Sequence, residues 1–293
     1  MGNFSSIHAA KGRRFKLRRK PIQLGSLDSH GTTMSHEGIT TVRVDNRCDF
    51  SSFSDLCICV VTWNMNGQVT YEDLAELVGN NRKFDLLVVG LQEVPRKNIS
   101  RLLQAALLDS HILLGKSIMQ SIHLYVFGLK DSDLFTKEVK IDKSPVGGFG
   151  GLIRRKKGAV AIRLNYKGIT MVFISCHLSA HAQNVEKRNS EFRNLLTNND
   201  QLLQEAERGQ IFEGYSEGTL TFKPTYKYNI GSSNYDTSYK VRMPSWTDRI
   251  LFKTQDTEEI HATLHSYDAM DDIHSSDHKP VKAHICLKLS KPS

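Results

Sequence analysis

Several segments of the sequence place amide, carboxylate or imidazole side chains directly beside apolar runs. Amide and carboxylate oxygens suit hard cations such as Mg²⁺, whereas imidazole binds anions or transfers protons near neutral pH. Each segment also has an ordinary structural explanation, so its neighbours must decide its meaning. The groups are Asn64 and Asn66 after residues 56–63, Glu93 at the end of 85–93, His177 after 170–176, and Asp277 with His278 before 281–287.

Taken singly, these segments leave alternatives open. The amides and glycine of TWNMNG at 62–67 are typical of a turn. A carboxylate such as Glu93 at the end of a buried strand is costly unless it is paired or binds metal, and both readings stand. His177 and His181 have the four-residue spacing of zinc ligands on a helix, but no HExxH pattern or cysteine ligand accompanies them. Phosphate-binding or hydrogen-bonding histidines are therefore favoured.

Three further segments carry mixed chemistry near the C-terminus. FKPTYKY at 222–228 and PSWTDRIL at 244–251 combine aromatic, basic and acidic residues, as a solvated loop also does. In HSSDHKPV at 274–281, Asp277 stands beside His278, and an aspartate near a histidine can fix the imidazole tautomer and raise its basicity.

The elements that must position these groups are buried strands and a few helices. Short apolar runs rich in β-formers predict strands, and apolar residues at helical spacing predict helices at 70–82 and 99–108, the first capped by Thr70 with Asp73. The pattern indicates a layered α/β domain with a mixed or antiparallel sheet after residue 118. The predicted strands are 56–63, 85–93, 123–128, 159–164, 170–176, 249–252 and 281–287.

In their order along the chain, these segments resemble the inositol-polyphosphate 5-phosphatase family, which belongs to the DNase I-like metal-dependent phosphoesterases. The resemblance covers roughly residues 56–288 and rests on WNMNG, LQE, SCHLSAH, KPTYKY, PSWTDRIL and SDHKPV. PSWTDRIL stands for the family's PxWCDRIL, with Thr247 in place of cysteine. The resemblance implies a DNase I-like four-layer α/β sandwich, with two mixed sheets flanked by helices.

The resemblance also implies roles for individual residues. Glu93 is expected to bind Mg²⁺ with help from Asn66, while Asn64 contacts the scissile phosphate or positions Asp248. His278, oriented by Asp248, is expected to stabilise charge on the phosphoryl oxygens. The remaining expected site residues are Asp277 as an outer metal or water ligand, His177 and His181 on the phosphate, and Lys157, Tyr226, Lys227 and Arg249 around a neighbouring 4-phosphate.

One family motif is absent. Between the CHLxAH helix and the KPTYKY loop, the family carries W-x-G-D-x-N-Y-R, which supplies the expected general base and a phosphate-binding Asn. Here residues 188–194 are followed almost at once by 200–215, and no GDxN occurs in the chain. The domain therefore resembles one shortened near 194–199, with a core strand region deleted. We expect impaired hydrolysis, unpaired ladder partners for 170–176, and a helix at 185–196 running on into 202–208.

The N-terminal residues 1–50 differ in composition from residues 51–293, the expected catalytic domain. KGRRFKLRRK at 11–20 holds seven basic residues in a chain of net charge +8, which predicts a disordered basic arm and an anionic partner such as a membrane surface. MGNFSS fits an acylation pattern with Gly2 as acceptor. We expect the protein to be cytoplasmic and to associate peripherally with the cytosolic face of membranes.

Composition and motifs leave three classes of function. The first is a working 5-phosphatase acting on inositol polyphosphates or phosphoinositides, the second is a non-catalytic phosphoinositide-binding relative, and the third is a nuclease. The KPTYKY and DRIL segments argue against a nuclease and against a nucleic-acid partner. The five cysteines show no second Cys-x-Cys or Cys-x-x-Cys pair, which argues against a zinc site.

Overall fold

Two β-sheets make up most of the part of the chain that the computed structural model describes, namely residues 3–7, 39–45, 48, 55–79, 83–130, 139–145, 157–166, 169–178, 214–254 and 260–289. The seven-stranded sheet has the order β2 (Ile39–Val42), β10 (Tyr215–Gly218), β11 (Asp248–Phe252), β1 (Asn3–Ile7), β9 (Ile169–His177), β8 (Gly158–Tyr166) and β7 (Val139–Pro145). The six-stranded sheet has the order β12 (Ile260–Ala269), β13 (Val281–Leu289), β3 (Asp55–Asn64), β4 (Leu86–Gln92), β6 (Ile122–Leu129) and β5 (His111–Met119). Both sheets are mixed, as the sequence predicts.

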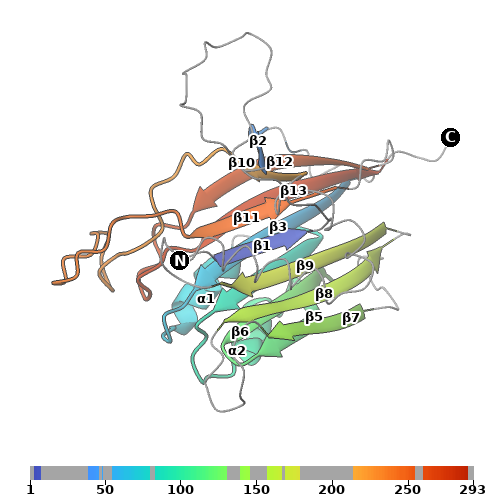
Figure 1. Ribbon diagram of the computed structural model, residues 1–293. Helices are drawn as coiled ribbons and strands as arrows, with labels where there is room; N and C mark the ends of the chain where they lie inside the picture. Colours follow the sequence, from blue (N-terminus) through green and yellow to red (C-terminus); the bar gives the residue numbers. More distant parts are fainter. Residues whose placement is uncertain are drawn as a thin grey trace, which may run out of the picture.

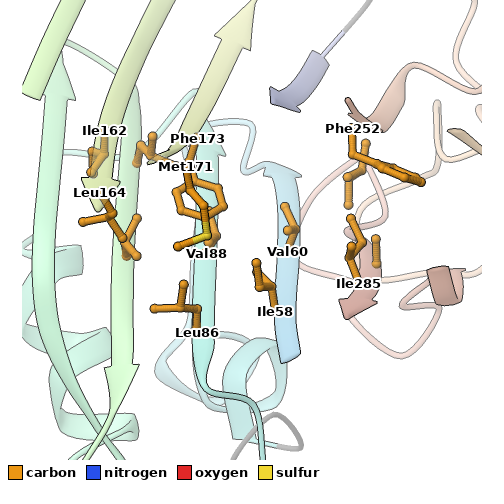
Figure 2. Close-up of a cluster of buried hydrophobic side chains, with 14 of the residues drawn as sticks. Ile58, Val60, Leu86, Val88, Ile162, Leu164, Met171, Phe173, Phe252 and Ile285 are labelled. Atoms are coloured by element: carbon orange, nitrogen blue, oxygen red, sulfur yellow. The ribbon is translucent and has the colours of Figure 1, made fainter. Parts of the chain in front are cut away.

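The two sheets pack face to face, and alternation along the strands decides which side chains meet between them. On β3, Ile58 and Val60 point into this core, where they join Val88 of β4, Phe173 of β9 and Ile285 of β13 (Figure 2). The alternate residues of β3 point to the opposite face, because successive side chains of a strand project to opposite sides. The inter-sheet core therefore holds both sheets in one rigid frame.

Helices α1 (Tyr71–Gly79) and α2 (Ile99–Ala106) cover the outer face of the six-stranded sheet, where Leu74 and Leu103 are buried. The predicted cap of α1 is confirmed: the Thr70 hydroxyl accepts a hydrogen bond from the Asp73 N–H at 3.0 Å and donates to the Asp73 carboxylate at 2.8 Å. Neither described helix is long and apolar enough to cross a membrane. The helix expected at 185–208 lies outside the described residues.

The prediction of a disordered arm over residues 1–50 needs correction in two places. Residues 3–7 form β1 and residues 39–42 form β2, both inside the seven-stranded sheet. The rest of the arm, apart from 43–45 and 48, lies outside the described residues. These segments form strands despite their polar composition, because the neighbouring strands offer unpaired backbone donors and acceptors. Burying such groups without hydrogen-bond partners is costly in free energy.

Strand β1 also overturns the prediction that residues 170–176 lack ladder partners. It runs antiparallel to β9, with Phe4 opposite Cys176, and parallel to β11, with Phe4 opposite Arg249. In Figure 1 the dark blue arrow of β1 lies beside the yellow-green arrow of β9, although the two are far apart in sequence. The N-terminal segment thus fills the position between β9 and β11, and the sheet is continuous across it.

Candidate active site

The predicted site residues gather at one edge of the paired sheets. Parallel pairing of β3 with β4 places Asn64 opposite Gln92, so Glu93 follows at the same edge. In the other sheet, β1 sets Asn3 between His177 and Asp248, the last residue of β9 and the first of β11. The Gln92 amide donates to Thr62 and to Ser175, each at 3.2 Å, and so links the two sheets directly below this edge.

A buried hydrogen-bond network fixes the imidazole of His278. Its Nδ1–H donates to the Asp248 carboxylate at 2.8 Å, and both side chains are almost fully buried. The same carboxylate oxygen accepts from the hydroxyls of Thr225 at 2.7 Å and Thr247 at 3.0 Å. Because Nδ1 is engaged, Nε2 remains for an external group. Asp248, rather than the sequence neighbour Asp277, therefore orients this histidine.

The loop that carries His278 is attached to the end of β3. The Ser276 hydroxyl donates to the Asn64 carbonyl at 2.7 Å and accepts from the His278 N–H at 3.1 Å. The Trp63 indole N–H donates to the His278 carbonyl at 3.2 Å, and the Tyr226 ring lies 4.4 Å from the His278 ring. The imidazole is thus held on several sides before any substrate binds.

Glu93 and His177 form the second part of the site. Glu93 Oε1 lies 3.5 Å from Nε2 of the fully buried His177, and the Lys157 ammonium contacts the same nitrogen. Glu93 and Asn66 have left-handed backbone conformations, with φ of 51° and 47°. Such conformations are strained for residues other than glycine and gather at functional sites. The Asn66 N–H donates to the Asn64 side chain at 3.0 Å, which braces this turn.

The donor set at this edge fits a hard divalent cation. Glu93 supplies a partly exposed carboxylate, and Asn64, Asn66 and Asp277 supply further oxygens, which Mg²⁺ and Ca²⁺ prefer. Burial raises the pKa of the Asp277 carboxyl, the negative charge of Glu93 adds to this, and His278 and Lys227 oppose it. The pKa of Asp277 is thus influenced by Glu93, the expected metal ligand, by His278, expected on the phosphate, and by Lys227, expected on the head group.

Lys227 is held in place by the carboxylate of Asp236, which stays ionised. Its Nζ lies 3.9 Å from Asp236 Oδ1. Hydrogen bonds from the Arg242 N–H first, and then from Ser238, lower the pKa of Asp236 to about 2. Burial raises the pKa of the neighbouring Tyr226 hydroxyl, which favours its neutral, hydrogen-bonding form.

The prediction for Arg249 needs correction. Its guanidinium pairs with both carboxylate oxygens of Glu217 on β10, and Tyr267 donates to the same carboxylate at 2.8 Å. A guanidinium held in such a two-pronged ion pair is committed to joining β10 and β11. In the structure the Arg249 guanidinium thus joins two strands, whereas the sequence predicted it beside the 4-phosphate. Two other predicted residues, His181 and Gly2, lie outside the described residues.

Several supporting residues were missed from the sequence. Thr225 and Ser276 hold the Asp248–His278 pair and the end of β3, and Gln92 links the sheets. The Lys279 ammonium is buried and donates to the carbonyls of Asp271 and Ile273 at 2.8 and 2.7 Å. All four lie inside the quoted motifs, so membership of a motif was the available signal.

Comparisons with known proteins agree with this geometry. The profile of the Endonuclease/Exonuclease/phosphatase family 2 matches residues 61–198 and 191–284. The chain is 54% identical to the type IV inositol polyphosphate 5-phosphatase 11 of Arabidopsis thaliana over 98% of both chains. It is 28% identical to the phosphatidylinositol 4,5-bisphosphate 5-phosphatase A of Mus musculus over 80% of this chain, which spans 31% of that protein.

Two solved structures share the fold. The inositol polyphosphate 5-phosphatase domain of SPsynaptojanin, solved with inositol (1,4)-bisphosphate and calcium, has a TM-score of 0.63 at 23% identity, covering 80% of this chain and 86% of that one. Cimex nitrophorin, a nitric oxide complex, has a TM-score of 0.61 at 21% identity, covering 80% and 99%. Such similarity confirms the DNase I-like α/β fold, and the nitrophorin shows that this fold alone does not decide function. The sequence relatives and the family profile show that the chain belongs to the inositol polyphosphate 5-phosphatases, a family of phosphoric monoester hydrolases.

Proposed function

We propose that this chain binds inositol polyphosphates or phosphatidylinositol phosphates at the edge formed by β3, β4, β9 and β11. Its reaction is Mg²⁺-dependent removal of the 5-phosphate, far slower than in members that carry W-x-G-D-x-N-Y-R. The observation that carries the proposal is that the buried Asp248–His278 pair and the Glu93–His177 pair lie at the same edge of the paired sheets. Phosphoryl transfer depends mainly on positioning and on charge neutralisation, which these residues supply.

Each residue has a defined task in this proposal. Glu93 and Asn66 would hold Mg²⁺, which would supply charge neutralisation for the phosphate when bound. His278 directs Nε2 toward the phosphoryl oxygens because Asp248 occupies its Nδ1. Lys157 and His177 bring further hydrogen-bond donors to the same edge. Lys227 and Tyr226 would contact a neighbouring phosphate on the inositol ring.

The slow rate follows from the shortened chain. The alignment with the Arabidopsis relative runs over 333 positions, at least 40 more than the 293 residues of this chain. The family profile matches in two pieces that overlap at residues 191–198, and this range includes most of the expected deletion at 194–199. The strand that fills the position between β9 and β11 reads NFSSI and carries no carboxylate. A positioned general base contributes about 10²–10⁴-fold, so its loss accounts for a weak enzyme.

A second candidate is a working phosphatase with a replacement base, and one observation favours it. Burial raises the pKa of Asp277, which makes its carboxylate a better proton acceptor than an ordinary aspartate. Asp248 is less suited, because its carboxylate already accepts three hydrogen bonds. Asp200, another carboxylate near the shortened region, lies outside the described residues. An Asp277→Asn variant that loses the remaining hydrolysis while still binding head group would support this candidate.

The test of the proposal measures phosphate release, ligand binding and plasmid nicking by the purified full chain. Phosphate release from short-chain phosphatidylinositol 4,5-bisphosphate and from inositol 1,4,5-trisphosphate is measured with and without Mg²⁺, and binding of both ligands is measured by calorimetry. We expect clear binding, weak Mg²⁺-dependent release, and no nicking of supercoiled plasmid DNA. Plasmid nicking, or failure to bind either ligand, would overturn the proposal.

Lys227 is expected to decide head-group selectivity. Lys227→Ala should weaken binding to a 4,5-bisphosphorylated head group about 10- to 150-fold, because a hydrogen bond to a charged group contributes about 1.5–3 kcal/mol. Binding to a head group without the 4-phosphate should change little. The matched control is Lys116→Ala, which removes the same charge from an exposed position on β5. Equal losses for the two ligands would reject this role.

Localisation is the last part of the proposal: the chain associates with the cytosolic face of membranes through acylated Gly2 and the basic residues 11–20. One myristoyl chain binds membranes only marginally, with K of about 10⁴ M⁻¹, and basic residues supply the second attraction. Gly2→Ala should move the protein from the membrane to the soluble fraction of cells. An unchanged distribution would reject the anchor.

A further inference from the structure

Four potential metal ligands meet at the end of the six-stranded sheet that lies away from the catalytic edge. Cys57 near the start of β3 is the direct cross-strand partner of Cys286 near the end of β13. His284 lies two residues from Cys286 on the same face of β13, and Cys48 approaches from the segment before β3. One ligand atom from each of these residues lies within 4.8 Å of all the others.

The distances between these atoms fit a tetrahedral zinc site. Zn–S bonds of about 2.3 Å and Zn–N bonds of about 2.0 Å place neighbouring ligand atoms about 3.8 Å apart for two sulfurs and about 3.6 Å for sulfur and nitrogen. Cys48 Sγ lies 3.8 Å from Cys57 Sγ and 3.4 Å from Cys286 Sγ. His284 Nε2 lies 3.6 Å from Cys48 Sγ and 3.2 Å from Cys286 Sγ. Each separation is within about 0.4 Å of the tetrahedral value.

We propose that Cys48, Cys57, His284 and Cys286 bind one zinc ion as a closed structural site. Three thiolates and one imidazole leave no open position for water, which is typical of structural rather than catalytic zinc. Packing already orients the ligands: the edge of the Phe84 ring meets the His284 ring at 4.5 Å, and the His265 ring lies 5.0 Å from it. Cys57 and Cys286 are buried while Cys48 is partly exposed, so the ion enters on the Cys48 side.

The role of this zinc is to fasten the N-terminal connection to the sheet. The Asp45 N–H donates to the Leu264 carbonyl at 2.8 Å, and His265 contacts the Asp45 carbonyl, so Asp45 already lies against β12, while Cys48 contacts Cys286 of β13. Cys57 and the catalytic residue Asn64 are seven residues apart on β3, or roughly 23 Å at about 3.3 Å per residue. The site is therefore separate from the Mg²⁺ centre and independent of the proposed reaction.

Sequence spacing could not reveal this site, and the cysteine pattern argued against zinc. Two ligands precede or begin β3 and the other two lie more than 200 residues later, as the separation of 238 between Cys48 and Cys286 shows. Only the antiparallel pairing of β3 with β13 brings them together. The sequence argument against zinc considered only local pairs of cysteine ligands, and the proposed site contains no such pair.

The test measures metal content and cobalt spectra of the full chain, purified under reducing conditions and dialysed against Mg²⁺ buffer. We expect about one zinc per chain, released by a mercurial thiol reagent, and Co²⁺ should give the visible bands of a tetrahedral thiolate site. Cys48→Ser should weaken zinc binding on the order of 100-fold, since even outer partners of metal ligands contribute 10–100-fold. The matched control Cys59→Ala, on the same strand, should retain zinc, and so should Glu93→Gln.

Two results would overturn the proposal. One is a chain that retains no zinc and shows no thiolate-to-cobalt absorption on titration with Co²⁺. The other is a Cys48 disulfide with Cys57 or Cys286, detected as a loss of two hydrogens in the intact mass under non-reducing conditions. The cobalt titration uses the unmodified chain, so the proposal remains testable if a cysteine variant fails to fold.

Discussion

Insertion of a segment carrying W-x-G-D-x-N-Y-R at residues 194–199 is expected to raise the rate of phosphate release by about 10²–10⁴-fold, the usual contribution of a positioned general base. The other groups of the site are already in place: His278 is oriented by Asp248, and Glu93 lies beside His177. We therefore expect the largest gain from the base for the attacking water, with a further gain from the phosphate-binding Asn of the motif. Initial rates on the same lipid with Mg²⁺ compare the extended and natural chains.

A matched control separates the base from a general effect on folding. The same insertion with its motif Asp replaced by Asn restores the strand and the phosphate-binding Asn but supplies no carboxylate. We expect this control to bind head group as the extended chain does and to hydrolyse it as slowly as the natural chain. Comparable rates from the natural and extended chains would show that the deletion does not limit catalysis.

Ser5→Pro is expected to lower the free energy of unfolding by roughly 3 kcal/mol. Ser5 is the middle residue of β1, opposite Ser175 of β9 and Ile250 of β11. Proline lacks the N–H of a ladder hydrogen bond and is excluded from central strands, so β9 and β11 would lose their common partner. Urea denaturation measures the stability, and hydrogen exchange should show faster exchange at residues 174–177 and 248–252.

The control for this variant is Ser5→Ala, which keeps the backbone N–H of the ladder and should therefore destabilise the protein much less than Ser5→Pro. Equal stabilities of the Pro and Ala variants would show that β1 does not hold the sheet together. The two experiments are coupled, because an inserted family strand needs the position that β1 occupies. In the extended chain, Ser5→Pro should therefore have little effect on stability, and a double-mutant cycle measures this coupling.

Local sequence patterns were enough to predict the central strands, the two helices and the edge at which the candidate site residues gather. The apolar runs at β3, β4, β9 and β13 are long enough to be recognised as buried strands, because a strand buried on both faces needs no alternation. The polar residues after those runs then had to meet, since strand ends share an edge. The edge strands β5 and β12 were not predicted, because half-exposed strands mix polar and apolar residues.

Other features arose only from contacts between segments far apart in the chain. NFSSI has no strong strand pattern, yet it forms β1 because β9 and β11 present unpaired backbone groups on both sides. Arg249 belongs to a family motif, but the carboxylate of Glu217 on the neighbouring strand commits it to a structural ion pair. Cys48, Cys57, His284 and Cys286 become a candidate zinc site only when β3 pairs with β13. Residue types and order along the chain were thus sufficient to recognise the chemistry, whereas partners supplied by distant strands decided which groups are free to take part in it.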